Sequence, residues 1–168
     1  ELPEAVWGQS AIAVNSGREI TVVGGYTSLD RSEVSTRVSV IPAEFSRGVV
    51  DAGQLTEGRG EVALSVSSDG LRTFILVAGG RNGPSPLQTM VRLVRQELNG
   101  VIQYFQEELA AGCIQPGIFP EARWGARAVT LDNETILVLG GGNRSVNGYS
   151  SSRRAELYFP SHIPGATE

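Results

Sequence analysis

Short apolar runs recur along the chain, and polar turns separate them. Three of the runs end in a pair of glycines: ITVVGG at 20–25, FILVAGG at 74–80 and ILVLGG at 136–141. Each is preceded by another apolar run and by a turn of Asn, Asp or Gly residues, such as Asp69-Gly70. Two apolar runs joined by a tight turn predict a β-hairpin, and their nearly continuous apolar character predicts burial of both faces.

Further runs follow each glycine pair after a polar loop. A third run lies at 37–42, 91–94 and 155–160, and a fourth lies at 101–105 and, more weakly, around 49–50. Four short strands per period predict one twisted antiparallel sheet for each period.

The segment 87–109 has two interpretations. Its apolar residues fit a helical stripe with three- and four-residue spacing. However, Asn99-Gly100 is the strongest two-residue hairpin signal, and it would pair Leu98 with Val101 and Val94 with Phe105. Because Asn-Gly in the middle of a helix costs about 1 kcal/mol or more, we favour the hairpin.

The same pattern is repeated at the level of sequence identity. Residues 2–14 (LPEAVWGQSAIAV) and 119–131 (FPEARWGARAVTL) share six of thirteen positions at a spacing of 117 residues. A more diverged middle copy keeps Gly60 and Ala63, which we align with Gly8 and Ala11. The glycine pairs lie 55 and 61 residues apart, so the chain contains three copies of a unit of roughly 50–60 residues.

These units resemble the kelch repeat, in particular that of bacterial kelch proteins, which are often secreted. The residues that carry the resemblance are GARAVTLDNETILVLGG at 125–141 and SSRRAELYFP at 151–160. The resemblance implies an all-β fold of about three four-stranded antiparallel β-propeller blades. One partial propeller domain over 1–168 would hold blades at about 5–52, 58–110 and 122–160. It also implies an extracellular or periplasmic location. The tryptophan that the family carries in its outer strand is absent from all three copies.

Three blades are too few for a closed ring, because propellers close with four to eight. A single blade also cannot bury both of its faces. We therefore expect the propeller to be incomplete. Further blades of the same polypeptide, a second chain or self-association would complete it.

The composition removes several kinds of chemistry. All 14 basic residues are arginines, so lysine-dependent catalysis and a P-loop lysine are excluded. The single histidine, His162, and the single cysteine, Cys113, argue against a metal site, so we predict no metal and no cofactor. A net charge of −4 argues against nucleic-acid binding, and no apolar run is long enough to span a membrane.

No catalytic constellation remains, because the adjacent Glu107 and Glu108 would point to opposite faces of a strand. The loops after the glycine pairs offer arginine forks for carboxylates and tyrosine surfaces for glycans or proteins. In kelch propellers such loops form the rim that binds partners. We therefore expect a non-enzymatic module that recognises a protein or glycan ligand. The alternative is part of a galactose-oxidase-like or sialidase-like enzyme whose catalytic residues lie outside this chain. The predicted binding residues are Tyr26, Arg81, Asn82, Asn143, Arg144 and Tyr149.

Overall fold

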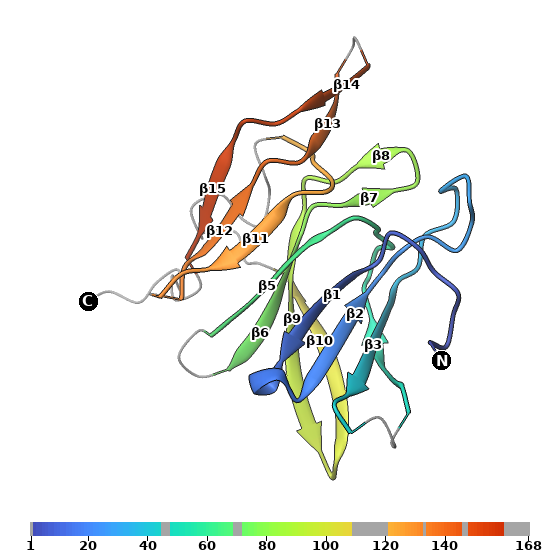
Figure 1. Ribbon diagram of the computed structural model, residues 1–168, viewed down its shortest axis with the longest axis vertical. Helices are drawn as coiled ribbons and strands as arrows, with labels where there is room; N and C mark the ends of the chain where they lie inside the picture. The colour runs from blue at the N-terminus through green and yellow to red at the C-terminus, as the bar shows by residue number, and fades with distance from the viewer. Residues whose placement is uncertain are drawn as a thin grey trace.

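The computed structural model describes residues 2–44, 48–68, 72–108, 121–132, 134–145 and 148–159 (Figure 1). This part of the chain is all-β and antiparallel, and its only helical element is the 3-10 turn η1 (Asn15–Gly17). Cys113, His162 and the Asp69-Gly70 turn lie outside the described residues.

The strands form three main sheets, which lie side by side in chain order (Figure 1). Sheet I consists of β1 (Ser10–Val14), β2 (Glu19–Val23), β3 (Arg37–Pro42) and β4 (Val50–Gln54). Sheet II consists of β5 (Ala63–Ser68), β6 (Thr73–Ala78), β9 (Met90–Leu98) and β10 (Val101–Glu108). Sheet III consists of β11 (Arg127–Thr130), β12 (Ile136–Leu139) and β15 (Ala155–Tyr158). The four-stranded sheets predicted for the first two units are therefore present, and the third sheet has three strands within the described residues.

Two short hairpins project from one end of the sheets. They are formed by β7 (Arg81–Asn82) with β8 (Ser85–Pro86), and by β13 (Gly142–Ser145) with β14 (Gly148–Ser151). Each follows directly after a glycine pair.

The hairpin interpretation of the segment 87–109 is confirmed. Strands β9 and β10 are antiparallel, with Leu98 opposite Val101 and Val94 opposite Phe105. Asn99 and Gly100 both have positive φ angles, of 53° and 77°, as the favoured two-residue hairpin turn requires.

Among the described residues, sheet II is the only one of the three sheets that is packed against a neighbour on both faces. Its strand β6 alternates: Ile75 and Val77 belong to the cluster shared with sheet I, whereas Phe74 and Leu76 belong to the cluster shared with sheet III. The predicted burial of both faces therefore holds for β6. On the outer faces of sheets I and III, Ile20 and Leu139 are exposed.

The ladder pairings correct the alignment of the middle unit by one residue. Ser10 pairs with Val23, Ala63 with Ala78 and Arg127 with Leu139, each just before a glycine pair. The residues two positions before Ser10, Ala63 and Arg127 are Gly8, Glu61 and Gly125. Glu61, and not Gly60, therefore corresponds to the two glycines. All three have φ between 55° and 64°. Glycine occupies this left-handed position in the first and third units, whereas a glutamate occupies it in the second, so the glycine at 60 is no marker of the position.

Three backbone hydrogen bonds join sheet I to sheet II near the glycine pair. Gly25 N–H donates to Arg59 O (3.1 Å), Arg59 N–H to Ser35 O (3.3 Å) and Glu61 N–H to Gly8 O (2.7 Å). This contact leaves no room for a side chain, since a Cβ on Gly24 would lie 1.9 Å from the Arg59 carbonyl oxygen. The glycine pairs thus have a packing role.

The first strands of the three sheets, β1, β5 and β11, line a hollow of about 310 Å³ with residues 9–11, 62–64 and 126–128. No helix among the described residues is long and apolar enough to cross a membrane.

Candidate functional site

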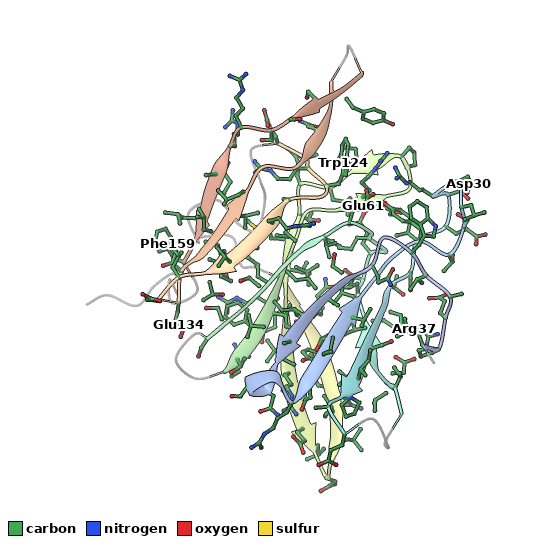
Figure 2. The ribbon with its side chains drawn as sticks, viewed as in Figure 1. Asp30, Arg37, Glu61, Trp124, Glu134 and Phe159 are labelled. Atoms are coloured by element: carbon green, nitrogen blue, oxygen red, sulfur yellow. The ribbon has the colours of Figure 1, made fainter. Side chains whose placement is uncertain are left out.

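The candidate site lies at the end of the sheets where the chain leaves each glycine pair. The residues that follow the pairs are Tyr26, Arg81 and Gly142, and each forms an antiparallel bridge to a residue that precedes the first strand of a sheet. The bridge partners are Trp7, Gly60 and Trp124. Figure 2 shows Trp124 and Glu61 at this end, beside the β7–β8 hairpin, with Asp30 on the neighbouring loop.

One part of the site surrounds the Trp7 and Tyr26 rings, whose centroids are 4.8 Å apart. The Arg31 guanidinium lies over both rings, with Cζ 5.0 Å from the Trp7 centroid and 5.7 Å from that of Tyr26. Glu61 closes this group, because its carboxylate is 3.5 Å from Arg31 Nη2 and accepts a hydrogen bond from the Tyr26 hydroxyl (3.3 Å). The charge on Arg31 is therefore compensated within the protein.

The Tyr26 hydroxyl is held in its protonated form. Burial of the side chain, together with the nearby negative charge of Glu61, raises the pKa of Tyr26 to about 12. Tyr26 therefore acts as a hydrogen-bond donor to Glu61 at every physiological pH.

The other part of the site surrounds Arg81. Its Cζ lies 4.6 Å from the Trp124 centroid and 5.7 Å from that of Tyr149. The two rings are themselves in an edge-to-face arrangement, with centroids 5.5 Å apart. Trp124 precedes β11 and Tyr149 lies on β14, so the third unit supplies the aromatic surface for an arginine from the second.

The two parts meet at Gly60. A Cβ at this position would lie 2.6 Å from the Tyr26 ring, so only glycine lets the ring lie against the backbone. Gly60 and Arg81 also exchange two backbone hydrogen bonds of 2.9 Å. Together the seven residues form what we call the rim site: Trp7, Tyr26, Arg31, Glu61, Arg81, Trp124 and Tyr149.

Arg81 differs from the other buried arginines in its electrostatic environment. Arg59 and Arg123 are fully buried, but Glu57 and Glu156 lie 3.3 Å and 3.4 Å from their guanidinium groups. Arg81 is 4% exposed, and no carboxylate lies within ion-pair distance among the residues that the structure describes. Its Nη2 donates one long hydrogen bond to Pro84 O (3.4 Å), and its Nε has no partner there.

Of the six predicted binding residues, the structure brings three together in the rim site: Tyr26, Arg81 and Tyr149. Asn82 is exposed beside them and donates to Glu57. Asn143 is partly exposed on β13, and Arg144 pairs through its backbone with Tyr149, while its side chain lies outside the described part of the chain.

Sequence reasoning missed Trp7, Arg31, Glu61 and Trp124. The two tryptophans carried a usable signal, because they are identical in the first and third units. Arg31 and Glu61 carried no such signal in the sequence, since they come from different units and meet only through the packing of sheet I on sheet II.

A second hollow, of about 300 Å³, lies between sheets I and II at the opposite end of the strands, lined by residues that include Arg72, Arg95 and Tyr104. Arg95 is paired with Glu19 and Glu97, and Arg72 with Glu107. Within the described ranges, no three His, Cys, Asp or Glu side chains gather as metal ligands would. The rim site is therefore the stronger candidate.

No protein-family model and no curated protein matches this chain.

Proposed function

We infer that the chain is a non-enzymatic recognition module built from kelch-type propeller blades, and that its rim site binds a carboxylate group on a protein or glycan ligand. The antiparallel four-stranded sheets and the repeated glycine pairs support the blade assignment. The observation that carries the binding proposal is the guanidinium of Arg81, which is buried without a carboxylate partner among the described residues.

A buried charge is costly unless it is paired, because burial removes its hydration. The cation–π contacts with Trp124 and Tyr149 offset part of that cost, by about 0.5–2 kcal/mol for a contact of this kind. A ligand carboxylate supplies the remaining compensation through charge-assisted hydrogen bonds to the guanidinium fork. The site therefore selects for an anionic group.

Tyr149 provides the access route. Its side chain covers Arg81 from the β14 side, yet 71% of the residue is exposed. Because little surface of Tyr149 is buried, its ring can rotate away at low cost and admit a ligand. The exposed Asn82 next to Arg81 adds an amide that can hydrogen-bond a hydroxyl or a peptide group.

Two arrays test this proposal and separate its two ligand classes. One carries neutral glycans and glycans with sialic or uronic acids, and the other carries acidic peptides and their amidated forms. We expect the chain to bind carboxylate-bearing members of one array. Arg81→Met, which keeps an apolar side chain of similar length, should weaken that binding by about tenfold or more, the loss expected for a charge-assisted contact.

The matched control is Arg18→Met, because Arg18 is exposed and lies at the other end of β2. This control should bind within about twofold of the unmodified chain. Equal binding of neutral and acidic probes, or unchanged binding by Arg81→Met, would contradict the proposal.

A further inference from the structure

The contact between sheets I and II is repeated between sheets II and III. Gly80 N–H donates to Arg123 O (2.8 Å), Arg123 N–H to Leu87 O (3.0 Å) and Gly125 N–H to Glu61 O (2.8 Å). These three bonds correspond one by one to those made by Gly25, Arg59 and Glu61 at the first contact. The rule is therefore that each sheet offers one donor and two acceptors to the sheet that follows it in the chain.

The three sheets lie in a row, and the corresponding backbone groups lack hydrogen-bond partners at its two ends. On sheet III they are the Gly141 N–H and the carbonyl oxygens of Ser152 and Gly125. On the sheet I side they are the N–H groups of Val6 and Gly8 and the carbonyl oxygen of Val6. None of these six groups has a hydrogen-bond partner within the described residues.

The two sets are complementary in number, type and position. By the rule above, Gly141 N–H would donate to Val6 O, Val6 N–H to Ser152 O, and Gly8 N–H to Gly125 O. One end of the chain's row of sheets thus carries the partners of the other end.

The two outer faces also carry unburied apolar side chains. Those on sheet III or just beyond its strands include Val129, Leu131, Leu139, Leu157 and Phe159. The positions in sheet II that correspond to Val129 and Leu139 are Ser65 and Ala78, both buried against sheet III. On sheet I, Ile20 is 39% exposed, whereas its counterpart Ile75 in sheet II is buried against sheet I.

We propose that the outer face of sheet III binds the outer face of sheet I of a second copy of this chain, head to tail, and that two such contacts close a six-sheet ring. The number of copies follows from the size of known rings. The described residues of one copy form three main sheets and those of three copies would form nine, so two copies alone fall within the four to eight blades of known propeller rings. Head-to-tail contacts of this kind close into rings when the rotation permits. The hollow along β1, β5 and β11 then becomes part of a central channel.

The first measurement is the molar mass of the 168-residue chain by sedimentation equilibrium over a range of concentrations. We expect a reversible monomer–dimer equilibrium that approaches twice the mass of the chain. A monomer at every concentration would overturn the proposal, and so would a trimer or an open-ended series of higher species.

Two variants then test the geometry. Leu157→Glu on sheet III and Ile20→Arg on sheet I should each weaken the dimer by about tenfold or more, because each places a charge in both contacts. Leu29→Glu is the control, since Leu29 is 93% exposed on a loop, and it should dimerise normally. Circular dichroism checks that each variant remains folded.

An equimolar mixture of the two variants distinguishes head-to-tail association from other modes. In a mixed head-to-tail ring, one contact combines the unmodified sheet III of the Ile20→Arg chain with the unmodified sheet I of the Leu157→Glu chain. The other contact places the introduced carboxylate and the introduced guanidinium on opposing faces, where their charges attract. The mixture should therefore form more dimer than either variant alone. Disruption by Leu157→Glu alone, without an effect of Ile20→Arg, would indicate a symmetric contact between two copies of sheet III and would overturn the proposal.

Discussion

At the scale of single residues, a left-handed backbone and a close backbone approach are separate requirements for glycine. Gly17 and Gly24 both have positive φ, of 81° and 61°. A Cβ on Gly17 would meet no atom within 4 Å, whereas one on Gly24 would overlap the carbonyl oxygen of Arg59. Gly24 therefore sets how closely sheets I and II can approach.

Substitution of these two glycines separates the effects. Gly17→Ala should lower the free energy of unfolding by about 1–2 kcal/mol, the cost of the left-handed conformation for an L-residue. Gly24→Ala adds a clash with backbone, so its loss should exceed that of Gly17→Ala by about 2 kcal/mol or more. Urea denaturation followed by circular dichroism measures both. Equal losses in the two variants would show that the approach of sheet II tolerates a methyl group at Gly24.

The arginines show what sequence could not reveal at this scale. The chain has 14, and composition alone gives no sign of which are buried. Arg59 and Arg123 hold the carbonyl oxygens of Gly79 and Gly140, the first glycines of two pairs. Arg59 occupies the position that Val6 has in the first unit. Because the corresponding residue there is apolar, comparison of the units does not reveal that this position holds a buried cation. Arg81 was predicted as a binding residue because of its loop, and its burial emerged only from the packing of the third unit.

At the scale of elements, local sequence signals are sufficient to predict a hairpin, where the chain folds back on itself. Asn99-Gly100 predicted the turn and the register of β9 with β10, because two-residue hairpin turns fix both. The same signals say nothing about contacts between sheets. Strand β9 illustrates this, since its Arg95 forms an ion pair with Glu19 of β2, 76 residues earlier in the chain.

The ion pair between β2 and β9 predicts a pH dependence of stability. Burial by itself would raise the pKa of Glu19, but hydrogen bonds from Arg95 and Asn15 and the charge on Arg95 outweigh it and lower the pKa below the usual 4.5. A carboxylate with a lowered pKa in the folded state stabilises the protein above its unfolded pKa. That contribution is lost as the pH falls through the folded value.

We therefore expect Glu19→Gln to lower the free energy of unfolding by about 2 kcal/mol near pH 6. The difference from the unmodified chain should shrink as the pH falls below 4.5. Urea denaturation at a series of pH values measures it. The control is Glu97→Gln, because Glu97 contacts the same arginine from an exposed position and should cost under about 0.5 kcal/mol. A Glu19→Gln deficit that persists undiminished at low pH would show that the carboxylate charge is not the source of the stabilisation.

At the scale of the whole molecule, the three sheets differ in how completely the described residues cover them. Sheet II lies between two apolar clusters, whereas sheets I and III each contribute one face to a cluster and leave apolar side chains exposed on the other. The repeat predicted three similar units but not this inequality. Position in the row, rather than sequence within the unit, decides which faces are buried.

This difference in how the sheets are covered predicts that the hydrogen exchange of sheet III depends on protein concentration. Amides of β6 should exchange most slowly in dilute samples, because both faces of sheet II are already covered within one copy. Amides of β12 should be protected about tenfold more in concentrated samples, since association with a second copy covers the open face and stabilises the folded form. Exchange measured by mass spectrometry on peptides spanning 74–78 and 136–139 tests this. In the Leu157→Glu variant, the protection of β12 should lose its dependence on concentration. If β12 of the unmodified chain exchanges at one rate at every concentration, the open face of sheet III is not where a second copy binds.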